Sequence, residues 1–234
     1  MTRNQHPNVL NGSLGELELV CFRRPLPYRP VLRRMEARIA RIAKGTAAPA
    51  LWFLEHTPVY TAGTSADETE YWADTIKAIR DVPVVHTGRG GRYTFHGPGQ
   101  RVVYIMTPVR DRRGHLDLRG FIDRLQTWVI AALACLDVAA CTRSEAVGVW
   151  VARDGGGFDK IAAVGLRVRR TISYHGVAIN VDPDMAYYKG ILPCGIRKGG
   201  VTSLRRLGLT GSRASIMARL DQALAQTFIQ VWRS

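Results

Sequence analysis

Three runs typical of β-strands follow one another in the second half of the chain, with no helical pattern between them. They read VGVWVAR (147–153), KIAAVGLRVRR (160–170) and ISYHGVAINV (172–181). The turn-prone DGGGFD separates the first two runs, and a tight connection near Arg170 separates the last two. Connections this short leave no room for the crossover helices of a Rossmann-type fold, so the region predicts antiparallel or mixed pairing.

Amphipathic helices are predicted where apolar residues recur at spacings of three and four, over 30–44, 119–136 and 215–232. In the first of these, residues such as Met35 and Ile39 form the apolar stripe, whereas the arginines lie elsewhere on the helix. That helix should therefore have a strongly basic outer side, and the other two should close the fold against the sheet.

Four further short runs, rich in β-branched and aromatic residues, predict strands over 15–22, 50–60, 82–88 and 101–109. Because strands and helices mix without regular alternation, the predicted fold class is α+β, a mixed or antiparallel sheet packed with helices. No internal repeat or low-complexity linker divides the 234 residues, so one domain spanning 1–234 is expected.

The net charge of +14 is the extreme property of the composition, and it predicts an anionic partner or substrate. Nucleic acid and an acidic carrier protein would both be attracted by such a field. Basic clusters such as Arg167, Arg169 and Arg170 lack the interleaved aromatic residues of a base-stacking surface, which disfavours nucleic acid.

The cysteines Cys21, Cys135, Cys141 and Cys194 form no CxxC pair and no Cys/His cluster at zinc spacing. We therefore expect neither a metal site nor a disulfide framework, and we expect core packing for the first three cysteines. The longest apolar run, residues 128–136, is far shorter than the roughly 20 residues that span a bilayer. A cytoplasmic protein without a signal peptide is expected.

The densest glycine-rich stretch is TGRGGRYTFHGPGQRVVY (87–104). A plain hairpin needs one or two glycines, whereas this stretch has five, so we favour a ligand-binding loop in which Arg89 and Arg92 hold an anionic group. It is not a nucleotide fingerprint, because GxGxxG would need a glycine where Tyr93 stands and no GxxxxGK[ST] occurs.

Two other residues have a chemical and a structural interpretation. Lys160 opens an apolar strand, where a lysine is usually a solvated charge at a sheet edge. Cys194 lies in ILPCGI, where Pro193 fixes the backbone and Gly195 leaves the neighbouring amide sterically open, as suits a nucleophile that admits a carbonyl. A lone cysteine is more often a small buried apolar residue. The residues alone leave both interpretations open.

Seven stretches occur together, and in this order they resemble the octanoyltransferases of lipoate biosynthesis, also called lipoyl(octanoyl) transferases. They span roughly residues 54–204 and read LEHTPVYTAG, RGGRYTFHGPGQ, GVWV, KIAAVGLRV, HGVAINVD, ILPCGI and VTSL. The resemblance implies the catalytic fold of the lipoate-protein and biotin-protein ligases. One departure is Tyr188, which stands where family members often carry phenylalanine.

The resemblance also implies the site residues. The acyl-thioester cysteine falls on Cys194 and the essential lysine on Lys160. Three implied substrate-binding segments comprise Arg89, Gly90, Gly91, Arg92, Tyr93, Thr94, Phe95 and His96, then Ala163, Val164 and Gly165, then Gly176, Val177 and Ala178.

The implied reaction moves an octanoyl group from octanoyl-acyl carrier protein to a lysine of the lipoyl domains of 2-oxoacid dehydrogenases and of the glycine cleavage H protein. It needs no ATP. No cofactor, metal, nucleic acid or membrane is expected to take part.

On this interpretation the Lys160 ammonium stabilises the Cys194 thiolate, gives a proton to the leaving carrier thiolate, and then accepts one from the incoming lysine. Backbone amides near Gly195 and in the glycine-rich loop are the candidate oxyanion donors. His96 either orients the Cys194 region or bonds within the loop, and His175 is expected to line the acyl tunnel.

Three other functions stay open. An ATP-dependent lipoate or biotin ligase on the same fold would hold an adenylate phosphate with Arg89, Gly90 and Gly91, and would need no cysteine. A non-catalytic protein that binds carrier or lipoyl domains would tolerate loss of both Cys194 and Lys160. A nucleic-acid-binding protein is motivated by the charge alone.

Overall fold

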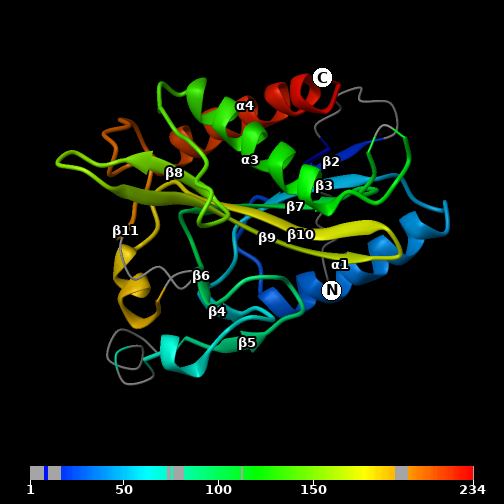
Figure 1. Ribbon diagram of the computed structural model, residues 1–234, viewed down its shortest axis with the longest axis horizontal. Coiled ribbons are helices and arrows are strands. Elements are labelled where there is room, and N and C mark those ends of the chain that lie inside the picture. The colour runs from blue at the N-terminus through cyan, green and yellow to red at the C-terminus, as the bar shows by residue number, and fades with distance from the viewer. Residues whose placement is uncertain are drawn as a thin grey trace, which may run out of the picture.

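A broad mixed β-sheet runs through the molecule, and helices cover both of its faces (Figure 1). The computed structural model describes residues 8–9, 17–72, 75, 82–111, 113–192 and 200–233. The strands pair in the order β1-β2-β3-β7-β10-β9-β11, and β8 pairs with β9. Their bounds are β1 Asn8–Val9, β2 Glu18–Cys21, β3 Ala50–Leu54, β7 Gln100–Met106, β8 Val149–Ala152, β9 Phe158–Arg169, β10 Ile172–Asn180 and β11 Gly200–Val201.

The pairing directions confirm the predicted α+β class. Strands β8, β9 and β10 are consecutive in sequence and pair antiparallel, as the three runs over 147–181 predict. Two pairs are parallel, β2 with β3 and β9 with β11, and these make the sheet mixed.

A second, three-stranded sheet lies beside the large one, in the order β5-β4-β6. It consists of β4 (Val59–Ala62), β5 (Val84–His86) and β6 (Thr94–His96), and the short 3₁₀ helices η1 (Glu68–Glu70) and η2 (Met185–Gly190) lie nearby in Figure 1. Because β6 lies inside the glycine-rich stretch, that stretch is not all loop.

The single strand predicted over 50–60 is wrong, because the structure has two strands there, β3 and β4, in different sheets. The chain leaves β3 at Glu55, and Pro58 lacks the N–H that a continuous ladder would need. Between them His56 is fully buried and bonds to the Leu26 carbonyl, which bends the chain out of the large sheet.

Helix α1 (Tyr28–Ala43) covers one face of the large sheet, where its apolar stripe packs in one cluster with residues of β7 and β10. Pro30 is tolerated because it lies in the first turn, where backbone N–H groups have no intrahelical partner. The outer side is basic, as predicted. Its exposed cations are Arg29, Arg33, Arg34, Arg41 and Lys44.

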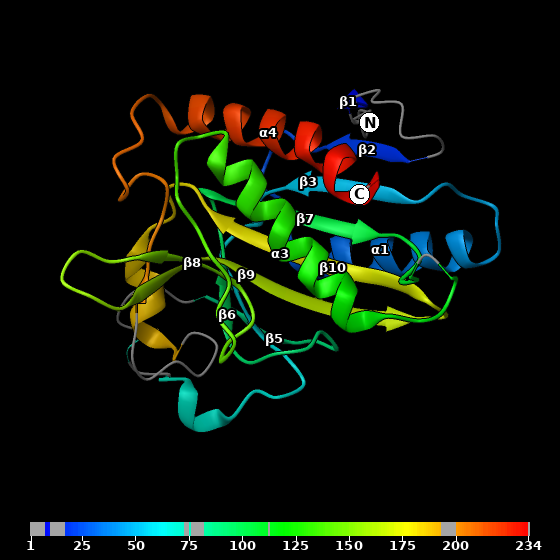
Figure 2. The same ribbon diagram turned by 45° about the horizontal axis from the view of Figure 1, so that its top comes forward.

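Helices α3 (Leu118–Ala134) and α4 (Arg213–Arg233) pack side by side on the opposite face (Figure 2). Trp128 joins them, because its indole nitrogen donates to the Leu224 carbonyl over 2.8 Å and its ring meets Phe228 edge to face. Both helices were predicted from their apolar spacing. Core packing was also predicted for Cys135, and this is wrong, because the residue is exposed at the C-terminal end of α3.

Candidate active site

Two of the predicted substrate-binding segments lie directly opposite one another. Strands β9 and β10 are in register so that Gly165 pairs with Gly176, and the pairs 164–177 and 163–178 follow along the same ladder. The two segments, which belong to consecutive strands, thus form one continuous surface on the large sheet.

A cavity of about 410 Å³ opens over this ladder, within the size range of small-molecule sites. All of the predicted substrate-binding residues line it except Tyr93 and Phe95. Its remaining walls come from α1, β7, β9, β10, the loop after β4 and the loop before β8. They comprise Tyr28, Ser65, Val102, Tyr104, Glu145, Ala146, Val147, Lys160 and His175.

Tyr93 and Phe95 lie instead in the core of the small sheet. Side chains alternate along a strand, so Thr94 and His96 point into the cavity while Phe95 points away from it. The Phe95 ring stacks on Tyr187 with centroids 4.3 Å apart, and this contact ties β6 to η2.

The two facing glycines of the ladder differ in how much space surrounds them. A Cβ on Gly176 would lie 2.2 Å from the Val103 carbonyl oxygen, a distance at which backbone must move. A Cβ on Gly165 would lie 3.3 Å from Cδ of Arg89, which is tight but leaves the backbone in place. Only glycine therefore fits the first position without distortion.

Arg89 and Arg92 are both bonded to protein groups in the structure. Arg89 is buried, and its Nη2 donates to the Thr61 carbonyl over 2.6 Å and to the Arg92 carbonyl over 2.9 Å, while Nη1 donates to the Gly90 carbonyl. Arg92 pairs with the buried carboxylate of Glu70. Both arginines thus hold the glycine-rich stretch in place at the cavity wall.

Lys160 is buried, with 4% of its surface exposed, so it is not the solvated edge charge that its position in the sequence most often indicates. Its Nζ donates to the Val147 carbonyl over 3.0 Å and lies 4.6 Å from the centroid of the Trp150 ring. The carbonyl and the face of the ring both favour a cation at this position.

Cys194 lies outside the described residues, as do Pro193 and Gly195. The chain on either side of 193–199 is firmly bonded. Before it, Leu192 donates its N–H to the Glu70 carbonyl over 2.8 Å. After it, Val201 of β11 pairs in parallel with Lys160, and Thr202 donates to the Lys160 carbonyl over 3.0 Å. The chain that follows Cys194 therefore returns beside Lys160.

Buried histidines gather between the cavity and α1. The Nδ1–H of His56 donates to the Leu26 carbonyl over 2.8 Å, so its Nε2 accepts from the Tyr104 hydroxyl over 2.6 Å. Burial lowers the pKa of His56 to about 4. Burial and the nearby Arg89 guanidinium lower the pKa of His175 to about 3. Both rings are therefore neutral at physiological pH.

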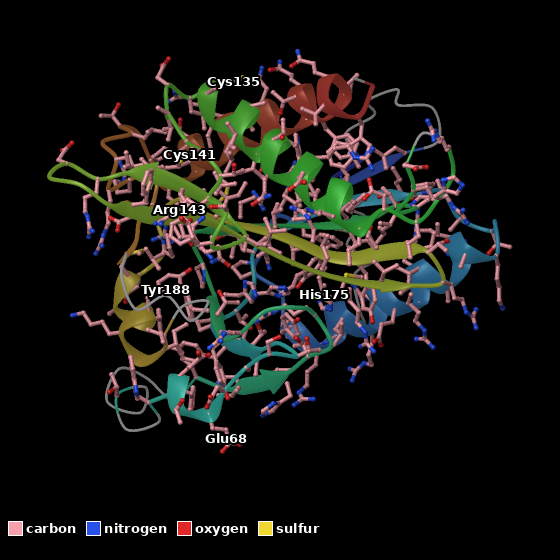
Figure 3. The ribbon with its side chains drawn as sticks, in the orientation of Figure 1. Glu68, Cys135, Cys141, Arg143, His175 and Tyr188 are labelled. Atoms are coloured by element: carbon pink, nitrogen blue, oxygen red, sulfur yellow. The ribbon has the colours of Figure 1, made fainter. Side chains whose placement is uncertain are left out.

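His175 lines the cavity, as expected for the acyl tunnel (Figure 3). Its backbone has φ of 65°, in the left-handed region, which is rare for a non-glycine residue inside a strand. Its N–H lies 3.3 Å from the sulfur of Met35 on α1, and its buried Nε2 has no hydrogen-bond partner among the described residues. Strain and an unpaired buried nitrogen at one residue point to a functional constraint.

A family model for the lipoyl protein ligase A/B catalytic domain matches residues 27–229. An octanoyltransferase of Parvibaculum lavamentivorans is 48% identical over 211 residues, which covers 89% of this chain and 89% of that protein. An octanoyltransferase of Maricaulis maris is 50% identical over 210 residues, which covers 89% of this chain and 90% of that protein. The chain belongs to the octanoyltransferase family. It is an acyltransferase of lipoate biosynthesis.

Solved structures confirm the fold predicted for an octanoyltransferase. A bi-partite lipoate protein ligase from Thermoplasma acidophilum superposes with a TM-score of 0.65 at 17% identity, over 92% of this chain and 83% of that one. A lipoate-protein ligase A bound with ATP gives a TM-score of 0.66 at 16% identity, over 92% of this chain and 85% of that one. At these identities the likeness is one of fold.

Several cavity residues of this octanoyltransferase were missed by sequence reasoning. Tyr104 was assigned only to a strand, although a buried tyrosine needs a partner for its hydroxyl and so signals a polar neighbour. Tyr28 lies two residues before the helix predicted over 30–44 and was not assigned. The loop residues Glu145, Ala146 and Val147 carry no pattern that marks them as cavity residues. Only the fold brings them next to Lys160.

In the parts of the chain that the structure describes, no group of three or more His, Cys, Asp or Glu side chains could hold a metal ion. Within those same parts, no helix has the length and apolar character needed to cross a membrane.

Proposed function

We propose that this octanoyltransferase moves an octanoyl group from octanoyl-acyl carrier protein to a lysine of a lipoyl domain, and that Cys194 carries the group as a thioester in between. The acceptors would be the lipoyl domains of 2-oxoacid dehydrogenases and the glycine cleavage H protein. The observation that carries the proposal is the position of Lys160. It is buried in the cavity wall and pairs through its backbone with Val201, seven residues after Cys194.

In the first half-reaction the Cys194 thiolate attacks the thioester carbonyl of the donor. A free thiol has a pKa of about 8.5, so the thiolate needs a cation nearby at neutral pH. The Lys160 ammonium is that cation. When the carbon–sulfur bond to the carrier breaks, Lys160 gives its proton to the carrier thiolate, and Cys194 keeps the octanoyl group. One thioester replaces another, so no ATP is consumed.

In the second half-reaction the acceptor lysine arrives as an ammonium. The neutral Lys160 amine takes one proton from it, and the freed acceptor amine attacks the Cys194 thioester. The carbon–sulfur bond breaks, the Cys194 thiolate re-forms, and the second nitrogen proton passes to solvent as the amide forms. The net reaction releases one proton and regenerates both Lys160 and Cys194.

The cavity wall offers the surface that an octanoyl chain needs. Val102, Ala163 and Ala178 present small apolar groups from three neighbouring strands, and Gly165 adds no side chain to the same wall. Each buried methylene contributes about 0.8 kcal/mol. The favourable burial of the chain would hold the thioester carbonyl near the catalytic pair.

An ATP-dependent ligase would need groups that bind the phosphate of an acyl adenylate. The candidates for that role are Arg89, Gly90 and Gly91. Of these, the Arg89 guanidinium already donates to the Thr61 and Arg92 carbonyls, and the Gly90 N–H donates to the Leu166 carbonyl. Such a ligase has no use for a nucleophilic cysteine, whereas ILPCGI supplies one. Both observations favour the thioester route.

The proposal is tested by incubating the protein with octanoyl-acyl carrier protein in the absence of ATP and measuring its intact mass. The wild type should gain one octanoyl group, and Cys194→Ala should gain none. Cys135→Ala is the matched control, because Cys135 is an exposed thiol that the mechanism does not use. An adduct on Cys194→Ala, or none on the wild type, would contradict the mechanism.

A further inference from the structure

A chain of buried polar side chains links the glycine-rich stretch to the residue that follows β11. His96 Nδ1 lies 2.7 Å from Gln100 Oε1, and Gln100 Nε2 lies 3.0 Å from Asn180 Oδ1. Asn180 Nδ2 then lies 3.0 Å from the carbonyl oxygen of Thr202. These four residues are at least nine-tenths buried, so each bond is shielded from water.

Backbone carbonyls fix the direction of every bond in this chain. The Thr202 carbonyl can only accept, so Asn180 donates its amide nitrogen there and turns its oxygen toward Gln100. Gln100 must then donate from Nε2, which also lies 3.2 Å from the Phe95 carbonyl, a second obligatory acceptor. The Gln100 oxygen therefore faces His96 and accepts from Nδ1–H.

The tautomer of His96 follows from that direction. With its proton on Nδ1, the neutral ring presents Nε2 as a hydrogen-bond acceptor. His96 lines the cavity, and its ring lies parallel to that of Tyr28 with centroids 6.1 Å apart. Burial lowers the pKa of His96 well below its usual value, so the ring stays neutral.

Thr202 lies at the other end of this row of hydrogen-bonded side chains, eight positions after Cys194 in the sequence. Thr202 donates its N–H to the Lys160 carbonyl and accepts from Asn180, so it is bonded to β9 and β10 at once. A small void of about 10 Å³ lies beside this point and is lined in part by Lys160, Asn180 and Tyr188. The polar chain thus reaches the immediate surroundings of Lys160.

We propose that Gln100 and Asn180 are positioning residues for acyl transfer. They hold His96 as the Nδ1–H tautomer at the cavity wall, and they hold Thr202, eight positions after Cys194, beside Lys160. The role in transfer rests on the proposed function, whereas the tautomer does not. Loosening the anchor should lower kcat more than it raises KM, because a misplacement of about 1 Å can cost roughly 10²-fold in rate.

The test compares three variants with the wild type. Asn180→Asp keeps the shape of the side chain but cannot donate to Thr202, and Gln100→Glu accepts from His96 but cannot donate to Asn180. Tyr188→Phe is the matched control. Its hydroxyl bonds to Asn180 and Gln100 over 2.9 Å, yet its removal leaves the Gln100–Asn180–Thr202 bonds in place.

Nitrogen-15 NMR of the imidazole rings reads the His96 tautomer without any turnover. We expect Nδ1–H in the wild type and in Tyr188→Phe. We expect kcat to fall by about 10²-fold in Asn180→Asp, with KM changed by less than about 3-fold. Gln100→Glu should shift His96 toward the doubly protonated form, because a carboxylate now accepts from Nδ1. Circular dichroism and melting temperature select variants that fold.

An Nε2–H tautomer in the wild type would overturn the assignment of His96. A folded Asn180→Asp that keeps kcat within about 3-fold of the wild type would overturn the positioning role, as would an equal loss in Tyr188→Phe. If the wild type forms no thioester adduct in the mass experiment, the role of Gln100 and Asn180 in transfer fails together with the proposed function. The NMR measurement still tests the assignment of the His96 tautomer.

Discussion

Val201 of β11 lies opposite Lys160 of β9 in a parallel pair, where the chain returns from the segment that carries Cys194. The Lys160 side chain is held at its other end, since Nζ donates to the Val147 carbonyl. A lysine fixed by backbone and side chain together would keep its amine in one place through both half-reactions of the proposed mechanism.

Lys160→Ala should keep the fold and the Cys194 thiol but lose transfer to a lipoyl domain by at least about 10²-fold, because proton transfer in both half-reactions depends on this amine. The measurement is single-turnover octanoylation of a lipoyl domain, followed by mass. Lys189→Ala is the control, since Lys189 is exposed on η2. Normal turnover in Lys160→Ala would remove the lysine from the mechanism.

The facing glycines of the ladder should respond differently to the same added methyl group. Gly176→Ala forces a Cβ to 2.2 Å from the Val103 carbonyl, so we expect a loss of about 1–3 kcal/mol in the free energy of unfolding. A Cβ on Gly165 would lie 3.3 Å from Cδ of Arg89 and 3.4 Å from the Gly90 carbonyl oxygen, so its neighbours need to shift by far less than Val103 would. It should change stability little and raise KM for the octanoyl donor by narrowing the cavity.

Urea unfolding and steady-state kinetics measure the two effects. The glycine comparison fails if Gly165→Ala is the more destabilised variant, or if Gly176→Ala unfolds at the same urea concentration as the wild type.

Local pattern was enough to predict the helices and the run of three strands, because apolar spacing and turn residues act over short distances. It was not enough at 50–60, where one apolar run supplies strands to two sheets. The bend depends on His56, whose carbonyl partner Leu26 lies thirty positions earlier in the chain. A hydrogen bond between such distant positions leaves no periodic trace in the sequence.

The candidate site was predicted more fully from resemblance than from local chemistry. Composition could not separate a solvated Lys160 from a buried one, because its partners Val147 and Trp150 come from another segment. For Tyr93 and Phe95 the resemblance predicted substrate binding, but neither residue lines the cavity. They lie within a predicted binding segment, yet strand alternation turns the Phe95 ring into the small sheet.

Stability should fall as the pH drops below about 6.5, because His56 is buried and neutral. Its pKa is lowered from 6.5 to about 4 by burial, so between these values the unfolded chain binds a proton that the folded chain does not. The free energy of unfolding is therefore fully present above pH 6.5 and decreases toward pH 4. At pH 5 the loss from this one residue is about 2 kcal/mol.

Urea unfolding at pH 8 and pH 5 measures that slope. His56→Gln should lower stability at pH 8 but show a shallower dependence on pH than the wild type. His86→Asn is the control, because it removes an exposed histidine in place of the buried one. Equal slopes in the wild type and His56→Gln would contradict a buried neutral histidine.

The basic side of α1 is the surface that we expect an acidic carrier protein, the donor in the proposed reaction, to contact. Arg33 and Arg34 are exposed there, and among the described residues of this helix only Arg38 forms an ion pair, with Glu18. Replacing both Arg33 and Arg34 with Glu should lower kcat/KM for octanoyl-acyl carrier protein by roughly 10-fold at low salt, since steering of a charged partner depends on the surface field. Raising the salt concentration should shrink the difference, because exposed charges are screened within about 10 Å at 0.1 M.

The control is the double variant Arg206→Glu, Arg219→Glu, which makes the same change in net charge at exposed positions outside α1. Its kcat/KM for octanoyl-acyl carrier protein should fall by less than about 3-fold. Octanoyl-pantetheine, an uncharged donor, should be used equally well by all three proteins. If the two double variants lose the same activity toward the carrier, the net charge and not the α1 surface attracts it.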